Sequence, residues 1–252
     1  MSLRKIIEDT WIIVVLNLLG LRTSIIPYIT IALLLPLGFT YLVSLAFRGM
    51  LSVEAAVNML VGVLILSLSL SMINGIGQSI AQDKLLKRLE LIASYPISPL
   101  SYVFGVSIVF LLSGMVSIIV VMLAGAFAWG IAYRVLPNFA QLLIVSLIAC
   151  IGLVGIGAII GTRSTSLPQA YSYTSIVSFA VALLTPAYYP PDIQPIPIRY
   201  LSYILPTTHA AYIVRHLLGI GVYAIALHYI LLVVTTIVYV LLGFIGIKWY
   251  EE

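Results

Sequence analysis

The side chains that could do chemistry are few in this sequence and lie far apart. Three histidines, His209, His216 and His228, follow one another at spacings of seven and twelve residues, which do not make a metal site. The single cysteine, Cys150, lies in an apolar run, so we expect a small packing residue without a disulfide partner in the chain. No His-Glu-x-x-His pattern, Ser/His/Asp set or pair of aspartates within an apolar stretch is present. We therefore expect no catalytic residue and no metal site.

One internal stretch, residues 78–100, concentrates the charged side chains. Its apolar residues recur at helical spacing, which predicts a short amphipathic helix over 82–93. The run Tyr95-Pro96-Ile97-Ser98-Pro99 should end this helix, because neither proline can continue it. Two interpretations remain open: a docking element for a partner protein, or an interfacial helix held by anionic lipid. The candidate docking residues are Asp83, Lys84, Lys87, Arg88, Glu90, Tyr95 and Pro96.

The composition of the chain is that of a membrane protein. Of its 252 residues, 62% are apolar and 8% are charged, and the mean hydropathy is +1.19. Soluble domains carry about 25% charged residues. The charged residues of this chain are too few to build a water-facing surface. The net charge of +4 would suggest nucleic acid in a soluble protein. Here the basic residues cluster in a few loops, which indicates membrane topology and no nucleic-acid partner.

The apolar stretches predict an all-α polytopic fold, a single transmembrane domain over residues 1–252. A span needs about 20 apolar residues. The apolar run from Trp11 is too short to cross, so we expect an interfacial helix over 2–21 rather than a signal peptide. Six transmembrane helices are expected at about 25–47, 56–80, 101–129, 139–161, 170–187 and 222–247.

The distribution of Lys and Arg predicts the orientation. With the N-terminus inside, eight basic residues lie on the cytoplasmic side and four on the other. This excess places both termini and residues 78–100 in the cytoplasm. No Asp, Glu, Lys or Arg lies near the centre of a predicted span. Ion-coupled carriers generally need ionisable groups there, so their absence disfavours that class of transporter.

Small and polar residues within the spans leave their roles open. Gly157 and Gly161 could serve a dimer interface or packing within one chain. Ser67, Ser69, Ser71 and Asn74 could line a pathway or bond to neighbouring helices. Between the fifth and sixth spans, residues 186–206 carry six prolines, which predict a broken extracellular helix pair, re-entrant or interfacial.

Taken together, these features resemble the permease subunits of type-two ATP-binding-cassette (ABC) exporters. Members have an N-terminal interfacial helix, six spans, a coupling helix between spans two and three and broken outer helices before span six. Part of the family signature is matched by Pro206-Thr207-Thr208-His209 followed after five residues by Arg215. We refer to Pro206, His209 and Arg215 as the signature residues.

The resemblance implies a half-transporter in the cell membrane. Two copies, or one copy and a related permease, would pair, and each coupling helix would dock on a separate cytoplasmic ABC ATPase that holds ATP and magnesium. The sequence has no G-x-x-x-x-G-K-[ST] loop, and none of its four lysines follows a glycine, so we expect no cofactor and no ATPase activity in this chain.

An uncharged pathway suits an apolar or amphipathic cargo: a drug-like molecule, a lipid or a lipid-linked glycan. A non-transporting membrane scaffold or assembly protein is the alternative.

Overall fold

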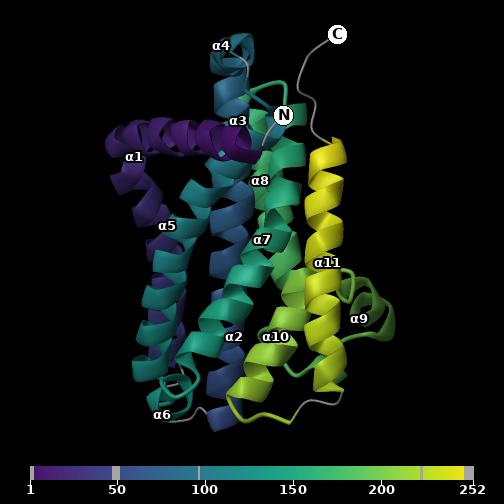
Figure 1. Ribbon diagram of the computed structural model, residues 1–252. Helices are drawn as coiled ribbons and strands as arrows, with labels where there is room; N and C mark the ends of the chain where they lie inside the picture. Colours follow the sequence, from purple (N-terminus) through teal and green to yellow (C-terminus); the bar gives the residue numbers. More distant parts are fainter. Residues whose placement is uncertain (1–2, 47–51, 96, 222–223, 247–252) are drawn as a thin grey trace.

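The computed structural model describes residues 3–46, 52–95, 97–221 and 224–246, and within these ranges it contains helices and no strand (Figure 1). The predicted all-α class is confirmed. The helices are α1 (Leu3–Ala46), α2 (Val53–Ser69), the π-helix η1 (Leu70–Asn74), α3 (Gly75–Leu85), α4 (Arg88–Ser94), α5 (Pro99–Ala128), α6 (Ala132–Val135), α7 (Phe139–Arg163), α8 (Leu167–Leu184), the 3-10 helix η2 (Pro191–Ile193), α9 (Ile196–Ser202), α10 (Pro206–Leu217) and α11 (Ile225–Gly246).

Five helices in the described part of the chain are long and apolar enough to cross a membrane. They match the second to sixth predicted spans, within a few residues for most of their limits. The first of them is continuous through α2, η1 and α3, Val53–Leu85. The other four are Pro99–Ala128, Phe139–Arg163, Leu167–Leu184 and Ile225–Gly246. The predicted span at 25–47 lies in α1, where Leu34–Ala46 is a shorter apolar stretch, so the count of six stays a prediction.

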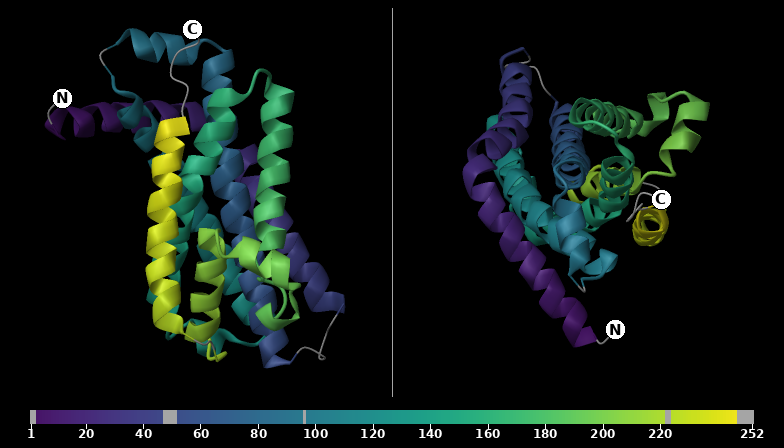
Figure 2. Two further views of the ribbon diagram at one scale, coloured as in Figure 1. Left: turned by 90° about the vertical axis from the view of Figure 1, so that its right-hand side faces the viewer. Right: turned by 90° about the horizontal axis from the view of Figure 1, so that it is seen from above.

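Helix α1 joins the predicted interfacial helix and the first predicted span in one element. Its first part lies across one end of the bundle, and its second part runs along the bundle (Figures 1 and 2). Ile13 is fully buried on α5 beside Gly105, where a Cβ would lie 2.5 Å from Ile13 Cγ2. The opposite side of the crossing part exposes apolar residues such as Trp11 and Leu19. Such a helix suits a membrane surface, and the interfacial placement stays a prediction.

Helix α2 forms the centre of the bundle. Ser52 caps its first turn, because the Ser52 hydroxyl accepts a bond of 3.1 Å from the Ala55 N–H. Within the span Val53–Leu85, 94% of an apolar stretch of 18 residues is buried against the rest of the chain. Helices α5, α7, α8 and α10 all contact α2. An apolar helix can be covered by lipid or by other helices, and α2 is covered by other helices.

Glycines allow α7 to approach α3 closely. A Cβ on Gly161 would lie 2.6 Å from the carbonyl oxygen of Gly77, and a Cβ on Gly157 would lie 3.1 Å from Ile76 Cβ. Both glycines of the Gly157/Gly161 pair therefore pack within this chain. Of the two roles left open by the sequence, the structure shows packing within the monomer.

Three residues of the α2–η1–α3 span, Ser69, Asn74 and Gln78, are bonded to α8. Ser178 donates 3.2 Å to the Ser69 carbonyl oxygen, and Gln78 Nε2 donates 3.3 Å to Thr174 Oγ1. Ser175 donates 3.5 Å to Asn74 Oδ1. The Gln78 and Asn74 side chains therefore bond to a neighbouring helix, which is one of the two roles that the sequence left open for Asn74. The hydroxyls of Ser67 and Ser69 are buried without a hydrogen-bond partner among the described residues, so their role stays open.

Short helices fill the segment between α8 and α11, as the prolines predict. Helix η2 and α9 lie outside the main bundle, and α10 packs within it between α2, α7 and α11 (Figure 1). Pro206 begins α10, a position where its missing N–H costs nothing. The start of α1 and the end of α11 lie at the same end of the bundle as α4, whereas α9 and α10 lie toward the other end (Figures 1 and 2).

Candidate functional site

The charged stretch forms two helices that meet at a turn, where one helix over 82–93 was predicted. Helix α3 ends at Leu85, and α4 begins at Arg88. Lys87 between them is left-handed, with φ 60° and ψ 13°. A non-glycine residue in this region breaks the helical path, so α4 leaves the axis of α3. The prediction of one continuous helix is therefore wrong at residues 86–87.

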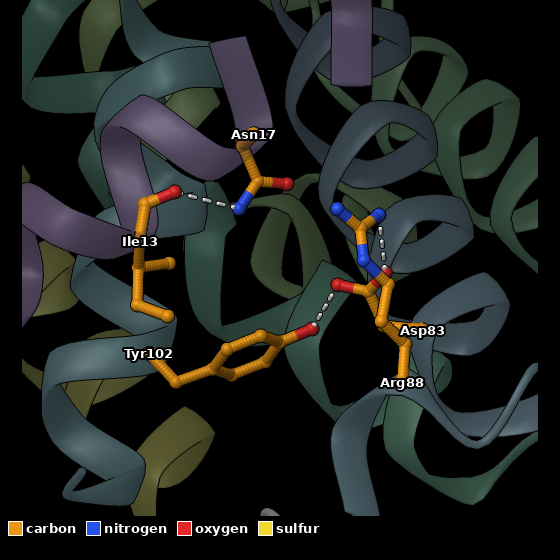
Figure 3. Close-up of polar contacts among 5 residues, drawn as sticks. All are labelled: Ile13, Asn17, Asp83, Arg88 and Tyr102. Atoms are coloured by element: carbon orange, nitrogen blue, oxygen red, sulfur yellow. Dashed lines mark hydrogen bonds and ion pairs between the residues drawn. The ribbon is translucent and has the colours of Figure 1, made fainter. Parts of the chain in front are cut away.

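Asp83 anchors this turn from inside the protein (Figure 3). Its side chain accepts a bond of 2.8 Å from the Tyr102 hydroxyl of α5 and pairs at 3.3 Å with Arg88 Nη1 of α4. Asp83 is 5% exposed, because α5 and α4 cover it. A buried carboxylate needs such partners to offset the loss of hydration. Asp83 therefore braces three helices and, because it is buried, contributes nothing to the exposed surface of the turn.

Helix α1 passes beside this cluster. Figure 3 shows Asn17 next to Ile13, and Asn17 Nδ2 donates 3.0 Å to the Ile13 carbonyl oxygen. A Cβ on Gly20 would lie 3.8 Å from both terminal nitrogens of Arg88. A movement of α4 would therefore reach α1 as well as α5.

Lys84 joins the same turn to α7. Its Nζ donates 3.1 Å to the Thr162 carbonyl oxygen, in the last turn of α7. A cation is favoured there, because the last carbonyls of a helix have no partner within the helix and carry the negative end of the dipole. Of the predicted docking residues, Asp83 and Lys84 are thus directed at the bundle.

The remaining predicted residues lie at the surface. Lys87 and Glu90 are exposed, and Arg88 keeps about half of its side chain exposed, at 47%. Large apolar side chains accompany them, with Leu91 65% exposed. We define the docking surface as Leu86, Lys87, Glu90, Leu91 and Tyr95, all exposed. Pro96 lies outside the described residues.

The signature residues lie on α10, toward the other end of the bundle from α4 (Figure 1). Pro206 packs on α7, where a Cβ on Gly152 would lie 2.9 Å from Pro206 Cγ. His209 is fully buried, and its Nε2 lies 2.9 Å from the Tyr203 carbonyl oxygen. Burial lowers the pKa of His209, against the smaller opposing effect of this bond, so the ring is neutral near pH 7.

The partners of His209 determine its tautomer. A carbonyl oxygen only accepts, so the proton of neutral His209 is on Nε2. Its Nδ1 then accepts from Nδ1–H of His228, 3.1 Å away on α11. His209 thereby fixes α10 to the first turns of α11.

Arg215 ties α10 to α2 and to the segment after α8. Its Nε donates 2.7 Å to Asn58 Oδ1, and its Nη2 donates 2.9 Å to the carbonyl oxygens of Ala187 and Tyr189. The side chain is 1% exposed. Burial lowers its pKa to about 10, so Arg215 remains a cation at neutral pH.

Sequence reasoning did not single out Tyr102 or Asn58. Tyr102 is one of 16 tyrosines, and nothing in its neighbours distinguishes it from the others. Asn58 meets Arg215 across 157 positions of the chain. Contacts of this range depend on helix packing, and no local spacing reveals them.

The geometry agrees with one finding from comparison with known proteins. A family model described as ABC-2 family transporter protein matches residues 47–245, a range that contains both α4 and α10. A search of curated proteins found no match. The match covers well over half of the chain and confirms the resemblance inferred from the sequence. This chain belongs to the ABC-2 family and is the membrane subunit of an ABC transporter.

Proposed function

We propose that the protein is the permease of an exporter, driven by a separate cytoplasmic ABC ATPase that binds the docking surface. The proposal rests on the difference in exposure between neighbouring residues of the turn between α3 and α4. Leu86, Lys87, Glu90, Leu91 and Tyr95 are exposed, whereas Asp83 beneath them is buried and bonded to two helices. A mixed apolar and charged surface on a rigid base is suited to protein recognition.

The contacts of the turn supply a route for mechanical coupling. When ATP closes the partner subunits, the load on α4 reaches α5 through Tyr102 and α7 through Lys84. It also reaches α2, because α3 continues into α2 through η1 as one helical element. Rigid helices that shift together can open a path on the opposite side of the membrane.

The orientation proposed from the sequence fits this arrangement. The start of α1, the end of α11 and the docking surface share one end of the bundle (Figure 1). We assign that end to the cytoplasm and the protein to the cell membrane, with two copies, or one copy and a related permease, in the working transporter. The cargo is apolar or amphipathic, since no charged residue lies near the centre of a predicted span.

The test is ATP hydrolysis that copurifies with the tagged chain from its native membranes. Lys87→Glu should lower the copurifying, magnesium-dependent activity by at least about tenfold, a loss of about 1.4 kcal/mol of binding. The matched control is Arg163→Glu, which makes the same charge change at the same end, in the last turn of α7 and off α4. Absence of ATPase activity from the wild type, or equal losses in both variants, would overturn the docking proposal. ATPase association without any flux in reconstituted vesicles would favour a scaffold.

A further inference from the structure

Two histidines that lie 19 positions apart in the sequence meet between α10 and α11. The Nδ1 atoms of His209 and His228 are 3.1 Å apart, and Nε2 of His209 lies 2.9 Å from the Tyr203 carbonyl oxygen. His209 is fully buried, and His228 is 7% exposed. Helices α10 and α11 lie side by side (Figure 1), and this bond fixes one to the other near the start of α11. The docking proposal makes no use of the pair.

The neutral pair has one nitrogen that can take a further proton. Because the Tyr203 carbonyl oxygen only accepts, one proton lies on His209 Nε2. The other proton lies on His228 Nδ1 and is donated to His209 Nδ1. Nε2 of His228 then carries no proton. A further proton there leaves the bond between the two Nδ1 atoms intact, but it gives the buried pair a positive charge.

The His228 ring lines a pocket of about 220 Å³ toward the end of the bundle opposite the docking surface. The pocket is formed by the start of α2, the η2–α9 segment, α10 and the first turns of α11. Glu54 and Asp192 in its lining are exposed, so the pocket is open to water. Water in the pocket can therefore deliver a proton to His228.

The charged groups of the pocket do not compensate a further positive charge. Two cations line it, Arg199 of α9 and Arg215 of α10, together with two carboxylates, Glu54 of α2 and Asp192 of η2. Their formal charges cancel. Both carboxylates are exposed, so water screens their attraction for a cation.

The other helices packed on α10 and α11 add little charge near the pair. Helix α7 contacts both of them, and its one charged residue, Arg163, lies in its last turn. From α6, Arg134 Nη1 is already bonded at 2.7 Å to the Leu218 carbonyl oxygen, just after α10. Within the described part of α11, His228 is the one histidine, and no Asp, Glu, Lys or Arg is present. Burial therefore decides the charge of the pair.

Burial favours the neutral pair. It lowers the pKa of His209, against the smaller opposing effect of the bond to the Tyr203 carbonyl oxygen. Tyr212 stacks on His228 with ring centroids 4.1 Å apart, and Tyr203 stacks on His209 at 6.0 Å. Aromatic rings thus replace water around both imidazoles. A conformation in which water reaches the rings would instead favour the charged pair.

We propose that His209 and His228 form a proton-sensitive latch between α10 and α11, closed when the pair is neutral and opened when the pair takes up a further proton. Protonation shifts the population toward any conformation in which the rings are more exposed. This inference goes beyond the proposed function, and its test needs no ATPase.

The pH range of the latch follows from the ordinary pKa of histidine, about 6.5. An exposed histidine takes up a proton as the pH falls through that value, whereas His209 in the closed latch stays neutral. The open state therefore binds more protons than the closed state. The closed latch loses stability as the pH falls below about 6.5 and keeps it above that value.

The test is amide hydrogen exchange of the purified full chain in detergent, measured by mass spectrometry at about pH 7.5 and about pH 5.5. Amides of α7 in the same sample are the reference, because the intrinsic exchange rate depends on pH equally in both helices. Relative to α7, we expect α10 to exchange faster at the lower pH, by about tenfold for each histidine that gains its proton only in the open latch. An unchanged ratio between α10 and α7 would overturn the proposal.

The variant His228→Asn separates the latch from a general effect of pH. Asparagine does not titrate, but its amide N–H can still donate to His209 Nδ1. The acceleration of α10 exchange at the lower pH should therefore fall by about tenfold relative to the wild type. His216→Asn makes the same change at an exposed histidine of α10 and is the matched control, which should keep the wild-type acceleration.

Two results with these variants would refute the latch: equal acceleration in the wild type and in His228→Asn, or loss of the acceleration in His216→Asn. If His228→Asn does not fold, the ratio between α10 and α7 in the wild type still decides.

Discussion

At the scale of single residues, two buried charges connect parts of the chain that lie far apart in the sequence. Asp83 joins α3 to α5 and α4, and Arg215 joins α10 to α2 and to the segment after α8. A buried charge is tolerated only when hydrogen bonds replace its hydration. Each of these residues therefore fixes the relative position of several helices, and a loss of one partner should be measurable.

Tyr102→Phe tests the anchor beneath the docking surface. The change removes the 2.8 Å bond to Asp83 and leaves a buried carboxylate oxygen without that donor. We expect unfolding in mild detergent to become easier by about 1–3 kcal/mol. Tyr171→Phe on α8 makes the same chemical change at an exposed ring and should be neutral. Equal stability of the two variants would show that the bond does not hold the turn.

At the scale of helices, close backbone approach decides how the bundle packs. Without a hydrophobic force between helices in lipid, small residues let van der Waals contact and polar bonds form. Gly157 and Gly161 of α7 serve α3 in this way, within one chain. The packing explains why these glycines lie in apolar stretches where larger residues would be more usual.

Gly161→Ala should weaken the contact between α7 and α3. The new methyl group would lie 2.6 Å from the Gly77 carbonyl oxygen, which is backbone and cannot move aside cheaply. Overpacking of this kind costs about 1–3 kcal/mol, measured as a lower midpoint of thermal unfolding in detergent. The control is Gly38→Ala in α1, where a Cβ would meet nothing within 4 Å. If both variants unfold like the wild type, the packing described for α7 is incorrect.

Long apolar helices were the part of this fold that the sequence predicted well. Spans two to six agree with the structure because length and hydropathy alone determine which stretches can cross a membrane. The turn at Lys87 was missed, since Leu86 and Leu89 keep the helical period while the backbone leaves it. The prediction that Asp83 is a docking residue failed for a related reason. Asp83 is buried against Tyr102, and only the packing of α5 brings Tyr102 near it.

At the scale of the whole molecule, the two ends of the bundle have different characters. One end presents the docking surface, and the other carries the signature helix α10 and the pocket with its two arginines. The excess of Lys and Arg predicts that the first end lies in the cytoplasm, which is the orientation that we propose. An export permease needs this polarity, because the ATPase acts on one side and the cargo leaves on the other.

Labelling of engineered cysteines by a membrane-impermeant maleimide tests this polarity in intact cells. Asp192→Cys should react at once, whereas Glu90→Cys should react only after the membrane is permeabilised. The native Cys150 is fully buried, so the unaltered chain should stay unlabelled and serve as the control. Labelling of both positions from the same side would contradict the assigned topology.

Photo-crosslinking from the docking surface shows whether an ATPase contacts α4. A photoreactive residue at Leu91, which is 65% exposed, should capture a polypeptide that also binds azido-ATP. The same probe at Ile193, 69% exposed toward the other end of the bundle, should capture no ATP-binding polypeptide. An ATP-binding adduct from Leu91 alone is the result that we predict. Its absence from Leu91, or its appearance at Ile193, would contradict the claim that an ATPase drives this protein through α4.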